Sequence, residues 1–183
     1  MQNFENLTEV ATHSQEIFDG IILHLFKDTV TLPNGNSATR EVIRHVGAVG
    51  VIPMTDDGKV IIERQFRYPL NRVITEIPAG KLDSFSEDRL SAAKRELEEE
   101  TGYTAAEWIE LGDYYPAAAY CDERITLYLA RGLALGTRHL DEDEFLNFEA
   151  VPLAQLLEDV MNGCITDGKT QVAVLKAARF LGL

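Results

Sequence analysis

Short hydrophobic runs separated by turn residues follow residue 20, and this pattern predicts β-strands. Asn34-Gly35 lies between two such runs and is typical of a tight hairpin turn. Gly47 and Gly50 are expected to allow close packing of a buried strand, because no helix follows them as a dinucleotide-binding loop would require. The strands predicted here span residues 21–26, 40–46, 47–53 and 59–68.

The segment of residues 86–101 has helical spacing instead. Its apolar positions recur every three or four residues, at Leu90, Ala93 and Leu97. Ser84 or Ser86 is expected to cap its N-terminus, and Gly102 its C-terminus. Further strands are predicted at residues 108–115 and 124–130, and helices at 153–162 and 170–181. Because strands and helices do not alternate regularly, this order favours an α+β protein.

Composition and charge argue against several classes of protein and of binding partner. The 183 residues are 45% hydrophobic and 26% charged, as in a globular protein with a buried core. A net charge of −13 without a basic stripe argues against nucleic acid. No apolar run suits a membrane span and residues 1–16 do not resemble a signal peptide, so we expect a cytoplasmic protein. Cys121 and Cys164 fit a reducing compartment, and their spacing does not indicate zinc.

Three carboxylates share one side of the predicted helix, because Glu96 lies three and four residues before Glu99 and Glu100. One interpretation is a solvated acidic face. The other is a metal site, since oxygen ligands on a rigid element suit a hard cation such as Mg²⁺. If the substrate is an anion, a bound divalent cation would also screen it from this acidic chain.

The residues around this helix resemble the Nudix box, the family signature G-x5-E-x7-R-E-U-x-E-E-x-G-U, in which U is aliphatic or aromatic. Gly80 opens the motif, Glu87 follows, and the stretch from Arg95 to Tyr103 reads R-E-L-E-E-E-T-G-Y. Six residues instead of five separate Gly80 from Glu87, so the loop before the helix carries an insertion. From Glu87 onward the register of the motif is kept.

The resemblance implies roles for the residues of the box. The metal ligands would be Glu96, Glu100 and the backbone carbonyl of Ala79. Glu99 would be a further ligand or the neighbour of one, and would belong to the catalytic residues. Arg95 would belong to the catalytic residues and, with Glu87, would tie the loop that starts at Gly80 to the helix. A plain i,i+4 ion pair between Arg95 and Glu99 is the alternative.

A second acidic run, residues 141–144, follows the strand region. Taken alone, four adjacent acids are typical of a solvated loop. In proteins similar to ADP-ribose pyrophosphatases, a loop at this point supplies the catalytic base and another metal ligand. The resemblance implies Glu142 as the base and Glu144 as the ligand, with the register inside the run left open. The base would take a proton from a metal-activated water that attacks phosphorus in line.

Stretches outside the box resemble the ADP-ribose pyrophosphatase subgroup: residues 40–49, 65–69, 76–81, 122–124 and 167–170. The resemblance implies that Arg67 contacts the phosphates or terminal ribose of the substrate, and that Glu76 shapes the nucleoside pocket. Taken alone, Arg67 is as well explained by a pair with Glu63 or another acid. The subgroup has a proline where this chain has Ala118, so the loop there is remodelled. Nearby tyrosines could stack on a base or belong to the core or rim: Tyr114, Tyr115 and Tyr120.

The resemblance implies a Nudix α/β/α sandwich with a mixed β-sheet over residues 45–183. It also implies a small N-terminal β subdomain, residues 1–44, that exchanges across a homodimer. The expected activity is Mg²⁺-dependent hydrolysis of the pyrophosphate bond of ADP-ribose, with Mn²⁺ as the alternative metal. Two alternatives are a pyrophosphatase for another nucleotide-sugar, such as ADP-glucose or GDP-mannose, and a Nudix sensor that binds its ligand without hydrolysis.

Overall fold

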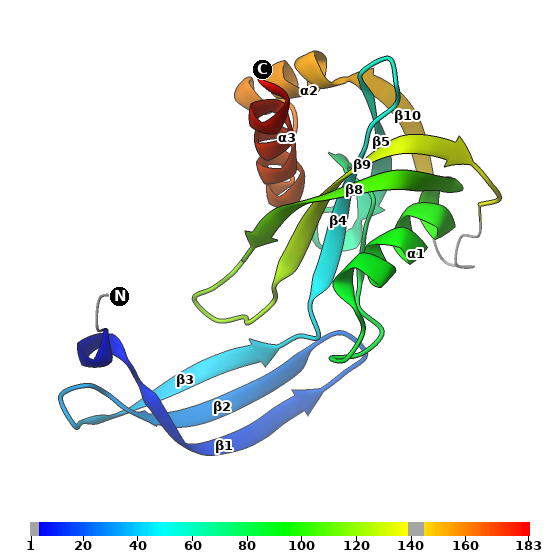
Figure 1. Cartoon of the computed structure of the whole chain (residues 1–183). Helices are drawn as coiled ribbons and strands as arrows, with labels where there is room; N and C mark the ends of the chain where they lie inside the picture. The colour runs from blue at the N-terminus through cyan, green and yellow to red at the C-terminus, as the bar shows by residue number, and fades with distance from the viewer. Residues whose placement is uncertain (1–3, 139–144) are drawn as a thin grey trace. The chain divides into compact units, whose positions relative to one another are not determined.

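The computed structural model describes residues 4–138 and 145–183 (Figure 1). The chain divides into two compact units. One comprises Met1–His45 with Ala117–Glu123, and the other comprises Val46–Pro116 with Arg124–Leu183. The smaller unit thus takes in a segment from the middle of the chain, beyond the N-terminal stretch that the sequence suggests.

The smaller unit is an antiparallel sheet in the order β1-β2-β3. Its elements are the 3-10 helix η1 (Glu5–Leu7), β1 (Val10–Asp19), β2 (His24–Thr31) and β3 (Ser37–Arg44). The predicted hairpin is present, with Gly35 at φ 84° between β2 and β3. Strand β1 was not predicted, because all ten of its residues are exposed and no burial pattern marks it. Hydrogen bonding to β2 holds it in place.

Residues 117–123 belong to the smaller unit through backbone pairing with β3. The amide of Ile43 donates to the carbonyl of Tyr120 at 2.7 Å, and Ile43 forms an isolated bridge with Cys121. The amide of His45 donates to the carboxylate of Asp122 at 2.7 Å. Ala118, the position where the subgroup has proline, therefore lies in this unit.

The larger unit is built on two sheets. A mixed four-stranded sheet has the order β7-β4-β9-β8, in which β4 runs parallel to β9 and the other pairs are antiparallel. An antiparallel three-stranded sheet has the order β10-β5-β6. The strands are β4 (Ala48–Pro53), β5 (Lys59–Arg67), β6 (Arg72–Glu76), β7 (Ala79–Lys81), β8 (Tyr103–Tyr114), β9 (Ile125–Leu135) and β10 (Leu146–Pro152), with the 3-10 helix η2 (Tyr68–Leu70) after β5.

Helices cover both faces of the four-stranded sheet. Figure 1 shows α1 (Arg89–Thr101) on one side, with α2 (Leu153–Met161) and α3 (Gly168–Leu181) on the other. Alternate residues of β4 serve the two layers, since Val49 and Val51 pack with α1 while Ala48 and Ile52 pack with α2 and α3. This burial on both faces confirms the α+β class and the α/β/α sandwich.

Several boundaries differ from the sequence prediction. Helix α1 begins at Arg89, and its N-cap is Asp88, whose carboxylate accepts from the amide of Ser91 at 2.9 Å. The prediction of Ser84 or Ser86 as the cap was wrong, because residues 84–87 form a turn ahead of the helix. Gly102 ends the helix at φ 75°, as predicted. Strands β6, β7 and β10 were missed, and no helix of the described segments is long and apolar enough to cross a membrane.

Candidate active site

The acidic side of α1 is partly buried against the protein. Glu100 is 6% exposed, although it shares this side with Glu96 and Glu99. The core side of the same helix carries Ala93 and Leu97, both fully buried. A buried carboxylate is costly unless it is paired or binds a cation, so the solvated-face interpretation does not account for Glu100.

Strand β7 lies directly beside these carboxylates. The amide of Ala79 donates to Oε2 of Glu100 at 3.0 Å. At Gly80, an added Cβ would lie 2.0 Å from Cδ of Glu96. The absence of a side chain at Gly80 therefore makes the space that the Glu96 carboxylate fills, next to the strand whose Ala79 carbonyl is the predicted backbone ligand.

Arg95 donates hydrogen bonds to acids of both the loop before α1 and the helix itself. Its guanidinium donates to Glu87 at 3.3 Å, to Glu96 at 2.7 Å and to Glu99 at 2.9 Å. It also donates to the carbonyl of Lys81 at 3.4 Å. The loop-to-helix tie with Glu87 and the i,i+4 pair with Glu99 are thus both present in one side chain.

The charges around Arg95 shift the pKa values of this group and of its partner. Burial lowers the pKa of Arg95, but the charge of Glu96 and hydrogen bonds to Glu87, Glu96 and Glu99 raise it by more, so the net shift is upward. The pKa of Glu87 is lowered, first by the hydrogen bond from the amide of Asp83 and then by Arg95. Both groups therefore stay charged at neutral pH.

Arg67 and Glu76 form a pair at the ends of β5 and β6. The guanidinium donates to both carboxylate oxygens of Glu76, at 2.6 and 2.8 Å. Arg67 therefore pairs with an acid, as one alternative held, and that acid is Glu76. The charge of Glu100 is among the causes that raise the pKa of Arg67, after the hydrogen bond to Glu76. Contact of either residue with a substrate stays a prediction.

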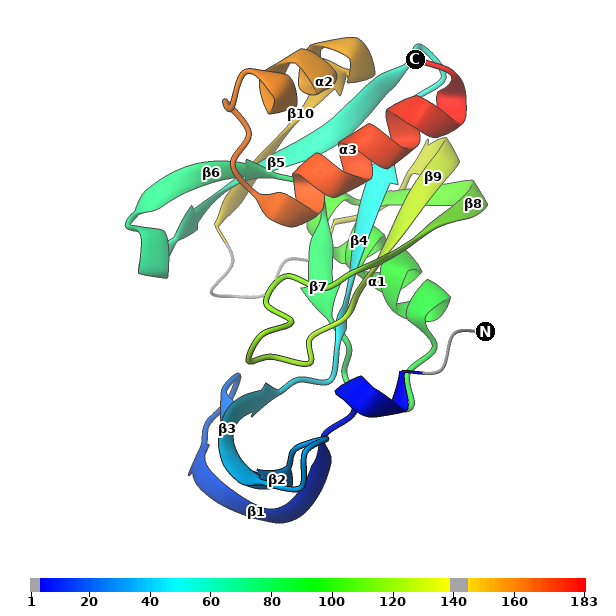
Figure 2. The ribbon, with the colours of Figure 1, turned by 90° about the vertical axis from the view of Figure 1, so that its left-hand side faces the viewer.

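Lys169, which the sequence reasoning did not single out, joins this pair from α3. Its amine donates to Oε2 of Glu76 and lies 3.2 Å from the carboxylate of Asp167. Asp167 caps α3 by accepting from the amide of Thr170, whose hydroxyl accepts from the amide of Ile77. The start of α3 is thereby fixed beside the segment between β6 and β7 (Figure 2). The D-G-K-T stretch was a sequence signal for a cap, but not for an ion pair with Glu76.

Two other arginines were missed, because they donate mainly to backbone carbonyls, which no sequence pattern reveals. Arg89 donates to the carbonyl of Arg124 at 3.1 Å, which ties the first turn of α1 to the start of β9. Arg138 donates to the carbonyl of Glu100 at 2.6 Å and to the carbonyl of Leu146 at 3.2 Å. The chain on both sides of residues 139–144 is thus tied to the last turn of α1.

The donors near β7 and α1 fit a hard divalent cation in their chemistry. Glu96, Glu100 and the Ala79 carbonyl offer oxygen atoms, and Gly80 leaves room for the Glu96 carboxylate beside β7. In the part of the chain that the structure describes, no group of three or more His, Cys, Asp or Glu side chains forms a ready metal cluster. The predicted base Glu142 and ligand Glu144 lie outside the described residues.

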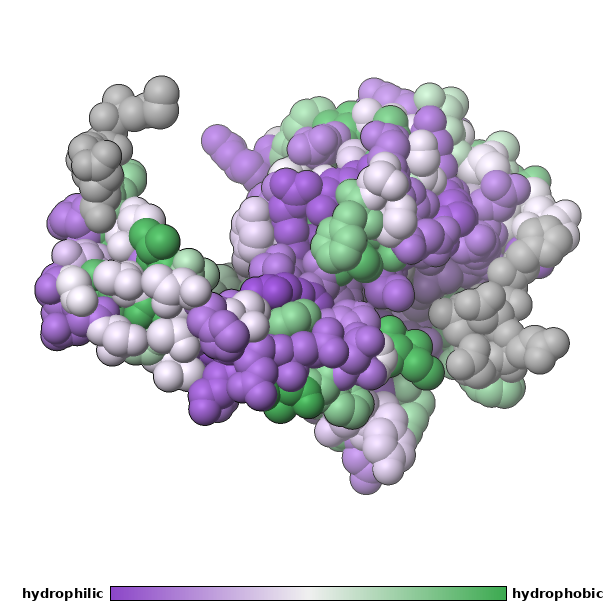
Figure 3. Space-filling view, turned by 90° about the horizontal axis from the view of Figure 1, so that it is seen from below, coloured by the Kyte–Doolittle hydropathy of each residue, from purple (hydrophilic) through white to green (hydrophobic). Residues whose placement is uncertain are grey.

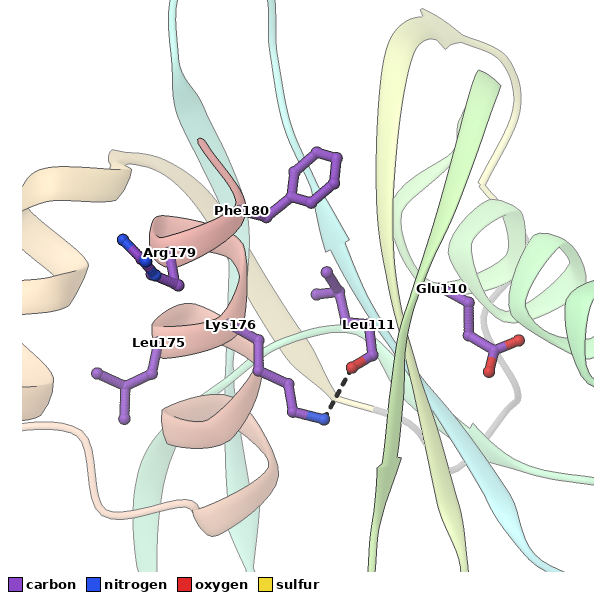
Figure 4. Close-up of a pocket in the computed structure, with 6 residues that line it drawn as sticks. All are labelled: Glu110, Leu111, Leu175, Lys176, Arg179 and Phe180. Carbon is purple, nitrogen blue, oxygen red and sulfur yellow. Dashed lines mark hydrogen bonds between the residues drawn. The ribbon is translucent and has the colours of Figure 1, made fainter. Parts of the chain in front are cut away.

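The tyrosines and the surface groove do not add to this cluster. Tyr114 packs against the core, with its hydroxyl 2.4 Å from where a Cβ on Gly168 would lie, while Tyr115 and Tyr120 are exposed. A groove of about 440 Å³ lies between α3 and β8 (Figure 4). Its lining contains none of the predicted site residues: Glu110, Leu111, Leu175, Lys176, Arg179 and Phe180.

The chain is similar to known proteins over most of its length. The NUDIX domain family model matches residues 44–169. An ADP-ribose pyrophosphatase of Bacillus subtilis (strain 168) is 41% identical over 172 residues, which cover 93% of this chain and 92% of that protein. A methanol dehydrogenase activator of Bacillus methanolicus is 40% identical over 168 residues, or 91% and 90% of the two chains. The crystal structure of an ADP compounds hydrolase matches with a TM-score of 0.85 and 21% identity, over 96% of this chain and 95% of that one, and so shows a shared fold.

Proposed function

The chain belongs to the NUDIX domain family, and we propose that it hydrolyses the pyrophosphate bond of ADP-ribose to AMP and ribose 5-phosphate. The observation that carries the chemistry is the placement of Glu96 and Glu100 against the backbone of β7. The substrate is taken from the Bacillus subtilis relative, which matches over nearly the full length of both chains.

The divalent metal that Nudix hydrolases generally need would be held by Glu96, Glu100 and the carbonyl of Ala79. We propose Mg²⁺, with Mn²⁺ as the alternative, because the donors are all oxygen atoms. The metal would lower the pKa of a water and neutralise charge on the diphosphate. Glu144 is the further ligand that we propose from the resemblance.

The protein's own side chains then divide the remaining work. Glu142, or a neighbour in residues 141–144, would accept a proton from the attacking water. Arg95 keeps Glu96 and Glu99 oriented through its hydrogen bonds. Arg67 presents a half-exposed guanidinium that suits the phosphates of the substrate. The water oxygen would bond to the adenosine-side phosphorus, and ribose 5-phosphate would leave.

The first experiment measures release of the nucleoside monophosphate with and without Mg²⁺: AMP from ADP-ribose, ADP-glucose, NADH and diadenosine polyphosphates, and GMP from GDP-mannose. We expect metal-dependent cleavage that is fastest for ADP-ribose. Faster cleavage of another compound would transfer the proposal to that substrate and direct attention to the loop around Ala118. Binding of ADP-ribose without cleavage of any compound would contradict an enzyme and indicate a sensor.

Hydrolysis in H₂¹⁸O tests the direction of attack. If water attacks the adenosine-side phosphorus, ¹⁸O appears in AMP and ribose 5-phosphate stays unlabelled. Label in ribose 5-phosphate would show attack at the ribose-side phosphorus, with AMP as the leaving group, and would contradict the proposed direction of attack. Mass spectrometry of both products after a single turnover gives the answer.

We further propose that the smaller unit mediates a homodimer. Among the described hydrophobic residues of 4–45, Val30 alone is buried. Exposed hydrophobic side chains occur along and after β1, at Val10, Ile17, Phe18, Ile21, Ile22 and Leu23. Figure 3 shows hydrophobic residues among hydrophilic ones on one face of the molecule. A three-stranded sheet that buries so little needs another apolar surface, and a second copy of the chain supplies the same sheet.

Sedimentation velocity tests the dimer. The wild-type chain should sediment as a dimer, and the double substitution Ile17→Ser with Phe18→Ser should shift it toward the monomer. Leu175→Ser is the matched control, since Leu175 is also an exposed hydrophobic residue but lies on α3. A wild-type monomer, or equal dissociation in the control, would contradict this interface.

We also propose a cytoplasmic location for the protein, and cell fractionation tests it.

A further inference from the structure

One buried carboxylate is shared by two cations at the start of α3. Glu76 is 3% exposed and accepts hydrogen bonds from Nε and Nη2 of Arg67, at 2.6 and 2.8 Å, and from the amine of Lys169. A buried carboxylate with one good cationic partner is already compensated in charge. The second cation, Lys169, means that Glu76 keeps a cationic partner even if the first one leaves.

The two cations differ in how they are held. The side chain of Lys169 is 11% exposed, and its amine also lies 3.2 Å from Asp167, the cap of α3. The side chain of Arg67 is 41% exposed and extends from the end of β5. Lys169 is thus fixed in the interior between two acids, whereas Arg67 has access to solvent on the same carboxylate.

The electrostatic consequence concerns what happens when Arg67 moves. Burial raises the pKa of Glu76, but the hydrogen bond from Arg67 and the charge and hydrogen bond of Lys169 lower it by more, so Glu76 stays ionised. If Arg67 alone balanced this charge, its transfer to an anionic ligand would leave a buried carboxylate without a partner, which is costly. With Lys169 in place, the carboxylate keeps a cation throughout.

We propose that Lys169 is a positioning residue that remains as the counter-ion of Glu76 while Arg67 exchanges Glu76 for the diphosphate of the substrate. The inference rests on the proposed function for the identity of that substrate. It needs no contact between Lys169 and the ligand. Arg67 is well suited to this exchange, because a guanidinium binds carboxylate and phosphate oxygens in the same two-pronged manner.

The exchange predicts a specific kinetic signature. Lys169→Met keeps the approximate length of the side chain and removes its charge. In this variant, Arg67 can bind the diphosphate only by leaving the buried Glu76 carboxylate without a cation. We expect KM for ADP-ribose to rise at least about tenfold with kcat within about twofold, since the interaction lost is one of binding and not of the reacting atoms. Lys169→Arg should restore most of the affinity.

A double-mutant cycle separates this role from direct contact. In a Glu76→Gln background the buried group is neutral and needs no counter-ion, so adding Lys169→Met should leave KM nearly unchanged. Lys176→Met is the matched control. Lys176 also lies on α3, and its amine donates to the carbonyl of Leu111 at 2.7 Å (Figure 4). This control removes the same charge from the same helix and should keep the wild-type KM.

Calorimetric titration with inorganic pyrophosphate in the absence of divalent metal provides a readout that does not depend on turnover. Lys169→Met should bind pyrophosphate at least about tenfold more weakly than the wild-type protein and Lys176→Met. Failure of the wild-type protein to cleave ADP-ribose would overturn the proposed function and leave this readout intact. Wild-type KM and pyrophosphate affinity in Lys169→Met would overturn the inference, as would an equal loss in the Glu76→Gln background or no pyrophosphate binding by the wild-type protein.

Discussion

Two charged clusters of the larger unit are organised in opposite ways. On α1, one cation, Arg95, is shared by Glu87, Glu96 and Glu99. At the start of α3, one carboxylate, Glu76, is shared by two cations. The first arrangement has carboxylate oxygens to offer to an incoming cation, and the second has a guanidinium to offer to an incoming anion. A metal-dependent enzyme for a diphosphate needs both in one neighbourhood.

The largest effect is expected from neutralising Glu100, the most buried carboxylate on the acidic side of α1. Glu100→Gln should lower kcat at least about 100-fold, because an amide binds a divalent cation far more weakly than a carboxylate does. Glu96→Gln should behave similarly. Steady-state release of AMP measures the loss, and Glu98→Gln is the control, since Glu98 is exposed on the same helix. Wild-type turnover in Glu100→Gln and Glu96→Gln would remove the metal site from α1.

A smaller effect is expected from disturbing the cradle of Glu96. In Gly80→Ala, the new Cβ would overlap the Glu96 carboxylate, whose nearest atom lies 2.0 Å away. The carboxylate is the end of a flexible side chain, so it should move at little cost in stability. We expect turnover at fixed Mg²⁺ to fall about 10–100-fold and to recover partly as Mg²⁺ is raised. The melting temperature should stay near that of the wild type. Turnover in Gly80→Ala that depends on Mg²⁺ as in the wild type would contradict the role of Gly80.

Replacing the shared cation of the acidic cluster should have a more modest effect. Arg95→Lys keeps one charge but loses the planar fork that reaches Glu87, Glu96 and Glu99 together. We expect a loss of about tenfold in kcat with little change in KM, because orientation of carboxylates is lost and not contact with the substrate. A change confined to KM would instead place Arg95 on the substrate.

The smallest effect is a change in the pH dependence of stability. The pKa of Glu76 in the folded protein lies below its ordinary value of 4.5. The ionised carboxylate therefore contributes stability that is present above about pH 4.5 and is lost as the pH falls through the folded pKa. Glu76→Gln should flatten the acid side of the unfolding free energy measured by urea denaturation. A slope equal to that of the wild type would contradict an ionised Glu76.

The sequence predicted those elements that bury a regular pattern of residues. Helix α1, the β2–β3 hairpin and strands β4 and β5 were found, because apolar spacing or turn residues marked them. Strand β1 was missed because it is exposed throughout. Strand β7 is three residues long, and its pairing with β4 defines it rather than any pattern of its own. Local spacing thus identified the elements with a periodic pattern and missed strands that are defined by pairing with residues distant in the sequence.

For the candidate site, the sequence by itself determined the acids of α1 and their sharing of one side, because 3.6 residues per turn fix that geometry within a single helix. It also pointed to Arg67 and Glu76. The tertiary structure alone decided that Arg67 pairs with Glu76, that Lys169 from α3 shares that carboxylate, and that Gly80 makes room for Glu96. These contacts join residues up to 93 positions apart, and their geometry follows from how β5, β6, β7 and the two helices pack. A helix carries its own spacing, whereas an ion pair between elements exists only once the core has set their separation.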